Sequence, residues 1–179
     1  MDKPKFTLLQ EEILRFLYSH ADKEFNKRNL AKMLRVSSTA IAKSLKKLVS
    51  ENFIIKSKNT STKIISIKLN RDNPKTIQLK RADNLKNIYL SGLFDYLDSN
   101  FLKSTIILFG SYSFGYDTST SDIDIAIIGK KEKKLEVENF EKLLGKKINI
   151  QFYSNLREIG KELRENLCNG IILQGGIEL

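Results

Sequence analysis

Apolar residues recur at helical spacing in the first part of the chain and predict three helices. The first covers about residues 7–21, with an apolar face of Leu9, Ile13, Phe16 and Leu17. The second is short, covers residues 27–34 and turns Leu30 and Leu34 inward. The third follows a cap region at Ser37 and Ser38 and runs to about residue 51, with Ile41, Leu45 and Leu48 on one face.

Two strand-like segments follow at residues 53–58 and 64–69, and in the second of them apolar and polar residues alternate. The polar stretch 59–62 between them predicts a hairpin tip. Three helices followed by a β-hairpin resemble a winged helix-turn-helix domain over about residues 5–70. Residues 29–41 resemble its helix-turn-helix.

The distribution of charge along the chain indicates a nucleic-acid partner for the first half. Residues 1–80 hold 18 Lys and Arg against 7 Asp and Glu, a net charge of +11, whereas residues 81–179 hold 13 against 14, a net charge of −1. Such an asymmetry is typical of a nucleic-acid-binding module joined to a near-neutral one. The other interpretation is a protein-docking winged helix whose lysines are solvated.

The winged-helix resemblance implies that the third helix enters the major groove of duplex DNA and that the wing touches the backbone. The candidate DNA contacts are Ser38, Thr39, Lys43 and Lys47, with Lys58 and Lys63 at the wing. Lysine side chains would mainly contact phosphates, which gives affinity without sequence information.

A polar run around Pro74 marks a boundary, and a helix is expected from about residue 81 to 99. We therefore expect an α+β protein with a winged helix-turn-helix domain at 1–73 and a connecting helix or linker at 74–100. A small α/β domain with a mixed sheet follows at 101–179. A helix capped by Asn155 and a buried Cys168 are expected in its last part.

The second half carries candidate chemistry. The apolar run 105–109 predicts a buried strand that ends in Gly110 and Ser111. A second strand begins at Asp122 and Asp124, which are two residues apart and so point to the same side. Two adjacent carboxylates are costly unless a cation pairs them, and Mg²⁺ is the expected partner. A glycine at the strand end lets backbone N–H groups approach a phosphate closely.

The set Gly110-Ser111, Gly115 and Ser121-Asp122-Ile123-Asp124 resembles the DNA polymerase β-like nucleotidyltransferases, in particular the minimal ones, over about residues 82–179. This resemblance implies transfer of a nucleotide from ATP or another NTP to a hydroxyl, with two Mg²⁺ ions held by Asp122 and Asp124. Gly110, Ser111 and Ser121 would bind the nucleotide. It also implies a macromolecular acceptor, which in the minimal family can be the partner protein of a toxin–antitoxin pair.

The family's third carboxylate is expected on the later strand 147–153, at Asn149 or, as the second choice, at Gln151, and both residues are neutral amides. Three explanations remain open. The site works with two acids and the substrate phosphates, another acid such as Glu138 or Glu141 reaches in, or the site binds nucleotide without turning it over. The last explanation would make the protein a nucleotide-sensing DNA-binding regulator.

Composition adds limits rather than chemistry. Cys168 is the single cysteine, so an intrachain disulfide is excluded. No apolar run approaches the length that spans a bilayer, so neither a membrane segment nor a membrane partner is expected. These features favour a cytoplasmic protein. A homodimer is one assembly that the sequence leaves open.

Overall fold

The computed structural model describes residues 6–58 and 64–177. The chain divides into two compact units, Met1–Lys80 and Arg81–Leu179, which are described one at a time.

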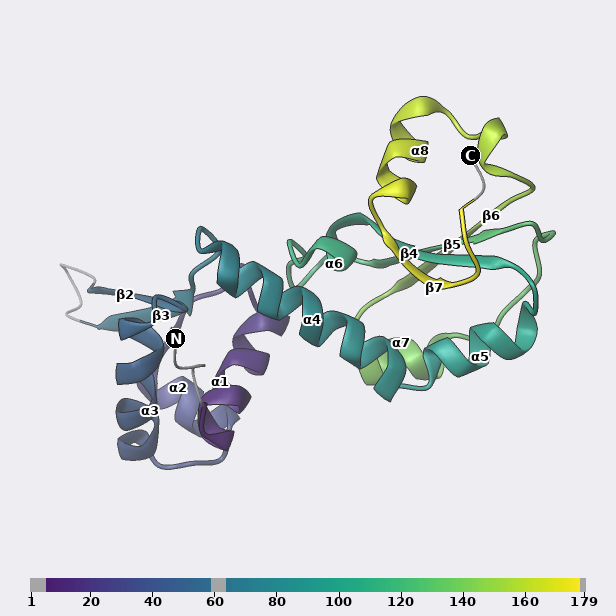
Figure 1. Ribbon diagram of the computed structural model, residues 1–179. Coiled ribbons are helices and arrows are strands. Elements are labelled where there is room, and N and C mark those ends of the chain that lie inside the picture. The colour runs from purple at the N-terminus through teal and green to yellow at the C-terminus, as the bar shows by residue number, and fades with distance from the viewer. Residues whose placement is uncertain (1–5, 59–63, 178–179) are drawn as a thin grey trace. The chain divides into compact units, whose positions relative to one another are not determined.

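The first unit has the element order of a winged helix (Figure 1). It contains α1 (Leu8–Ser19), β1 (Phe25–Asn26), α2 (Lys27–Met33), α3 (Ser38–Ser50), β2 (Ile54–Lys58) and β3 (Ile65–Leu69). The described strands pair antiparallel in the order β1-β3-β2. The three helices and the hairpin strands are thus confirmed, while the expected hairpin tip at 59–62 lies outside the described residues.

Side-chain caps fix where these helices begin. Thr7 and Gln10 form a capping box at α1, and the side chains of Asn26 and Ser37 accept backbone N–H groups at the starts of α2 and α3. The predicted cap before the third helix is therefore confirmed at Ser37. The predicted apolar faces meet in one core, which includes Ile13, Leu17, Leu30, Ile41, Leu45, Leu48, Phe53 and Ile67.

The region after the wing differs from the single helix expected at 81–99. Helix α4 (Pro74–Leu90) begins seven residues earlier, and α5 (Leu93–Asn100) follows a break at Gly92. Proline fits the first turn of a helix because its missing N–H would have no partner there, and the Asn73 side chain accepts the N–H of Lys75. Gly92 adopts a left-handed conformation, φ 76°, which ends the helical path.

A mixed sheet forms the centre of the second unit, as expected. Its described strands are β4 (Thr105–Phe109), β5 (Ile123–Ile128), β6 (Ile148–Tyr153) and β7 (Ile171–Gln174), in the order β6-β5-β4-β7. β5 runs antiparallel to β4 and parallel to β6, and β7 is antiparallel to β4. The short helix α6 (Gly110–Phe114) follows β4 directly.

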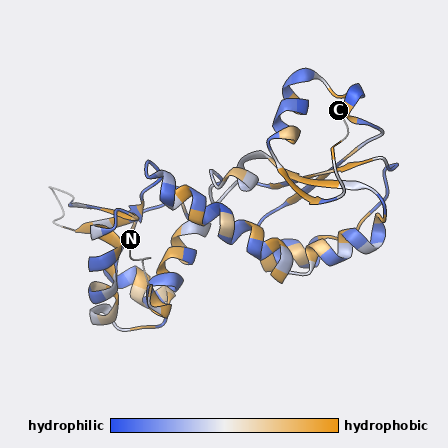
Figure 2. Ribbon diagram, viewed as in Figure 1, coloured by the Kyte–Doolittle hydropathy of each residue, from blue (hydrophilic) through white to orange (hydrophobic). Residues whose placement is uncertain are grey.

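Both faces of this sheet are covered, which explains why β4 and β5 are continuous apolar runs (Figure 2). Ile106 and Leu108 face a core shared with α4, α5 and α7 (Glu138–Leu144). Ile107 and Phe109 face the other side, where Leu167 of α8 (Lys161–Cys168) packs. Of the two carboxylates of the predicted site, Asp122 lies just before β5 and Asp124 is the second residue of that strand.

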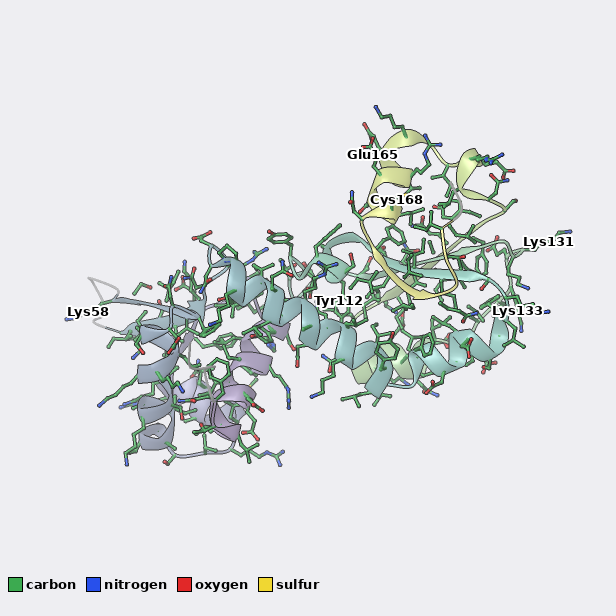
Figure 3. The ribbon with its side chains drawn as sticks, viewed as in Figure 1. Lys58, Tyr112, Lys131, Lys133, Glu165 and Cys168 are labelled. Atoms are coloured by element: carbon green, nitrogen blue, oxygen red, sulfur yellow. The ribbon has the colours of Figure 1, made fainter. Side chains whose placement is uncertain are left out.

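The last segment is less regular than expected. Asn155 caps only a 3-10 turn, Leu156–Glu158, and Gly160 precedes α8. The apolar residues Leu156, Ile159, Leu163 and Leu167 do pack against the sheet. The expectation of a buried Cys168 was wrong, because the side chain lies at the end of α8 and is exposed (Figure 3). Within the described chain, every helix is too short or too polar to cross a bilayer.

Candidate nucleotidyltransferase site

Gly110 marks the centre of the candidate site, where the end of β4 meets the beginning of β5. Its φ is +70°, a left-handed conformation that glycine adopts at little cost. A Cβ atom placed on Gly110 would stand 2.5 Å from Oδ2 of Asp124. Backbone and carboxylate therefore approach more closely than any other residue type would permit.

Asp124 lies in a row of three paired residues across the sheet. It pairs with Phe109 on β4 and with Asn149 on β6. The Nδ2 group of Asn149 donates a hydrogen bond to Oδ1 of Asp124, with the two atoms 3.2 Å apart. The predicted third-acid position is therefore at the site, and its amide group meets the carboxylate as a neutral donor.

The two carboxylates differ in exposure. Asp122, just before β5, is exposed, whereas Asp124 is half-buried. Ile123 and Ile125, which alternate with them, are fully buried in the core. Carboxylate oxygens are the ligands Mg²⁺ prefers, and protein Mg²⁺ sites commonly use one or two carboxylates together with substrate phosphates. The donor set fits Mg²⁺ on these grounds.

The two alternative acids, Glu138 and Glu141, both belong to α7. Glu138 is exposed at the start of α7. Glu141 accepts hydrogen bonds from the backbone N–H of Ile148 and from the Lys147 ammonium, both at 3.0 Å. These contacts lower the pKa of its carboxyl, the backbone bond most strongly. In the described ranges no group of three His, Cys, Asp or Glu side chains is placed to hold a metal ion. Glu141 is thus engaged at the start of β6, and the explanation that Glu138 or Glu141 supplies the third acid stays a prediction.

The nucleotide-binding candidates lie on either side of the loop between α6 and β5. Ser111 is half-buried in the first turn of α6, directly after Gly110. The Ser121 hydroxyl accepts the N–H of Thr118 at 2.9 Å, so it closes the loop just before Asp122. The Ser121 hydroxyl therefore stabilises the loop itself. Ser111 lies next to Gly110, where the backbone comes close to the Asp124 carboxylate.

The two tyrosines beside the site have different surroundings. Tyr112 is buried, and burial together with the nearby Asp117 and Asp83 carboxylates raises the pKa of its hydroxyl. It cannot stack on a nucleotide base from that position. Tyr116 is exposed in the loop and keeps that role open.

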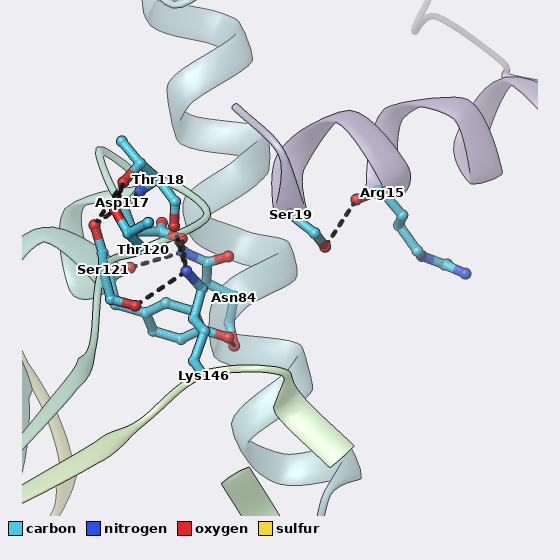
Figure 4. A network of polar contacts seen from close by, with 9 residues as sticks. Arg15, Ser19, Asn84, Asp117, Thr118, Thr120, Ser121 and Lys146 are labelled. Atoms are coloured by element: carbon cyan, nitrogen blue, oxygen red, sulfur yellow. Dashed lines mark hydrogen bonds and ion pairs between the residues drawn. The ribbon is translucent and has the colours of Figure 1, made fainter. Parts of the chain in front are cut away.

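Three residues of this region escaped the sequence analysis: Asn84, Asp117 and Lys146 form a buried polar network beneath the loop (Figure 4). They are 29 or more positions apart in the chain, and nothing in the local pattern distinguishes them from solvated polar residues. Only the fold brings them together.

A cavity of about 770 Å³ lies elsewhere in the second unit. It is lined by residues before and at the start of β4 and after β5, including Lys103, Thr105 and Gly129. Because β4 and β5 are antiparallel, this end of the sheet is the one opposite Gly110 and Asp124. The cavity is therefore separate from the candidate site.

The predicted DNA contacts lie mainly on α3. Thr39 and Lys43 are exposed, and Lys47 is half-buried with its Nζ atom 5.9 Å from the centre of the Phe6 ring. These three residues are four apart and so share one helix face. Ser38 begins α3 and is half-buried.

The wing candidates are only partly described. Lys58 is exposed at the end of β2 (Figure 3). Lys63 lies outside the described residues.

A groove of about 560 Å³ beside α3 contains further cations that the sequence analysis missed. Ala42 and Leu45 of α3 and Ile67 of β3 form its apolar part, and Lys27, Arg28 and Lys56 also line it. A basic composition alone does not reveal which lysines gather, so their position depends on the fold of α2 and the hairpin.

The first unit has the element order of a winged helix, and the second has a mixed sheet with Asp122 and Asp124 at the start of β5. Residues 90–172 match the family model described as "Nucleotidyltransferase domain". No curated protein matches the chain.

Solved structures of three regulators show limited similarity to the chain. The adhesin competence repressor AdcR from Streptococcus pyogenes is 22% identical over 54% of this chain and 69% of its own, with a TM-score of 0.42. A cysteine-to-serine mutant of ZitR from Lactococcus lactis is 23% identical over 57% and 67%, with a TM-score of 0.42. MepR in a DNA complex from S. aureus is 20% identical over 53% and 81%, with a TM-score of 0.39. At these low scores, the winged-helix assignment depends on the element order of the first unit itself.

Proposed function

We propose that this protein is a Mg²⁺-dependent nucleotidyltransferase that moves AMP from ATP to a macromolecular acceptor. The observation that carries the proposal is the contact between Gly110 and Asp124, in a stretch that matches the nucleotidyltransferase domain. A side chain at Gly110 would collide with the Asp124 carboxylate, and a glycine here would also let backbone N–H groups approach a phosphate.

Each residue has a role in this proposal. Asp122 and Asp124 would hold Mg²⁺, and Gly110 and Ser111 would bind the triphosphate through backbone N–H and hydroxyl groups. The metal, when bound, neutralises charge on the phosphates and on the leaving pyrophosphate. Asn149 is uncharged, so it orients Asp124 through its hydrogen bond but removes no proton from the acceptor. We expect slow turnover for this reason.

The test is transfer of label from α-labelled NTPs in the presence of Mg²⁺ or Mn²⁺ and a cell extract. Wild type is compared with Asp122→Ala/Asp124→Ala and with Asp95→Ala, which removes an exposed carboxylate on α5. Transfer by wild type and by Asp95→Ala, but not by the double variant, is the expected result. Transfer that survives loss of both acids would refute the proposal. The labelled species also identifies the acceptor, for which we propose a protein of the toxin type.

We further propose that the winged helix binds duplex DNA. The excess of +11 in residues 1–80 and the exposed face of Thr39 and Lys43 support this. Replacing Lys43 and Lys47 with Gln should weaken duplex binding about equally for all sequences. It should also reduce the slope of log K against log salt by about 2. Lys161→Gln on α8 is the control. An unchanged slope would favour the protein-docking interpretation of the winged helix.

A specific observation also favours a second function, a nucleotide-sensing DNA-binding regulator. A neutral donor at Asn149, hydrogen-bonded to Asp124, would leave nucleotide binding intact while weakening catalysis. In this case Mg²⁺ and ATP would change duplex affinity without any label transfer. Equal duplex affinity with and without nucleotide would exclude it.

A further inference from the structure

Lys146 and Asp117 form an ion pair in the interior of the second unit. The Nζ atom of Lys146 stands 3.2 Å from Oδ2 of Asp117, and their side chains are only 8% and 1% exposed. Removing two charges from water is costly and is compensated only by good geometry and further hydrogen bonds. The other hydrogen bonds of this buried pair therefore indicate which parts of the fold it stabilises.

On the aspartate side, the pair is joined to α4 and α6. The other oxygen of Asp117, Oδ1, accepts a hydrogen bond from Nδ2 of Asn84 at 2.7 Å. The same amide group donates to the backbone carbonyl of Tyr112 at 2.9 Å. Asp117 is thus held against two elements that do not belong to its loop.

On the lysine side, the pair is joined to the loop that carries the carboxylates (Figure 4). The Lys146 ammonium donates to the carbonyl of Thr118 and, at 3.3 Å, to the carbonyl of Ser121. Ser121 immediately precedes Asp122. The next residue after the lysine, Lys147, accepts the N–H of Ile123 on its carbonyl at 2.8 Å. Asp122 is therefore bracketed by contacts from two consecutive residues.

We propose that Lys146 and Asp117 are positioning residues that hold the loop 116–121 so that Asp122 stands in register with Gly110 and Asp124. This inference depends on the proposed function for its consequence, but its structural part does not. Lys146 is too buried to reach the substrate, so it acts through the loop carbonyls. If the loop were released, Asp122 would be less ordered and would bind the metal more weakly, because metal binding would then have to order the loop.

The experiment compares Asp117→Asn and Lys146→Met with Lys161→Met, which breaks an exposed ion pair with Glu165 on α8. Asp117→Asn keeps the shape and an acceptor for Asn84. Hydrogen exchange of residues 118–123 is measured beside that of the core strand β4. Mn²⁺ affinity is measured by EPR in the presence of a non-hydrolysable ATP analogue, and Lys146→Arg tests rescue by a conservative replacement.

The two buried variants should lose protection about tenfold or more at 118–123 with little change in β4, and Mn²⁺ affinity should fall about tenfold. Lys146→Arg should restore part of both. Protection and affinity like those of Lys161→Met would overturn the proposal, as would equal loss of protection in the loop and in β4. A wild type that transfers no label would count against the proposed function alone, since loop exchange still decides the positioning role.

Discussion

Replacing Asn149 with Asp puts an acid where the nucleotidyltransferase resemblance predicts one, and its consequences follow from the contact with Asp124. The donor and acceptor atoms are 3.2 Å apart. Two carboxylates at that separation repel by about 1 kcal/mol in a water-like dielectric and about 5 kcal/mol at an effective dielectric of 20. Because Asn149 is exposed, we expect a cost near the lower value, about 1–2 kcal/mol.

Without metal, the unfolding temperature of the second unit should therefore fall by about 4–16 °C, given about 4–8 °C per kcal/mol for a domain of this size. Mg²⁺ should reverse the loss, because the ion would neutralise the new pair, and label transfer should rise about tenfold or more. Melting curves with and without Mg²⁺, beside the transfer assay, measure both effects. Asn149→Ala is the control, since it removes the hydrogen bond without adding charge. A loss of stability that Mg²⁺ does not recover would refute this account of the site.

Three further variants test other parts of the structure. Gly110→Ala should reduce label transfer about 100-fold, because its Cβ would displace the Asp124 carboxylate from its place; full activity would contradict the close approach. Glu141→Gln should reduce the loss of stability on acidification. The pKa of Glu141 is lowered in the folded state, so its contribution is present above its ordinary value of 4.5 and is lost as the pH falls through the folded pKa; melting at pH 7 and pH 3 tests this, and an equal loss in both proteins would contradict it. Ile125→Ala should lower the free energy of unfolding by about 2–5 kcal/mol, because the side chain is fully buried; urea denaturation measures it, and a change below about 1 kcal/mol would contradict the packing.

The sequence predicted the elements that local patterns determine. Strand β4 coincides with its apolar run, and α3 begins at its serine cap. The helix expected at 81–99 was misplaced because proline was taken as a boundary, whereas here it occupies the first turn of α4. The break at Gly92 depends on a left-handed backbone that a helical pattern of apolar residues does not disclose. Cys168 was placed by residue type, but its position at the helix end leaves it exposed.

The candidate site divides in the same way. Gly110, Asp122 and Asp124 lie close in the chain, and their spacing carried the prediction. Asn149 was singled out because the family resemblance implies a third acid on the later strand, and the strand register pairs this residue with Asp124. The pair of Lys146 with Asp117 was not, since it joins residues 29 positions apart through a fold that the local pattern does not define. Which nucleotide and which acceptor the site takes stay predictions.

The row Phe109–Asp124–Asn149 crosses three strands whose pairing is fixed by buried residues on both faces of the sheet. Asn149 is the exposed member of that row, so exchanging its amide for a carboxylate would change the charge beside Asp124 and leave the packing of the buried core as it is. An asparagine codon becomes an aspartate codon by a single nucleotide change. Under the proposed function, one such change would add or remove the third acid beside Asp124.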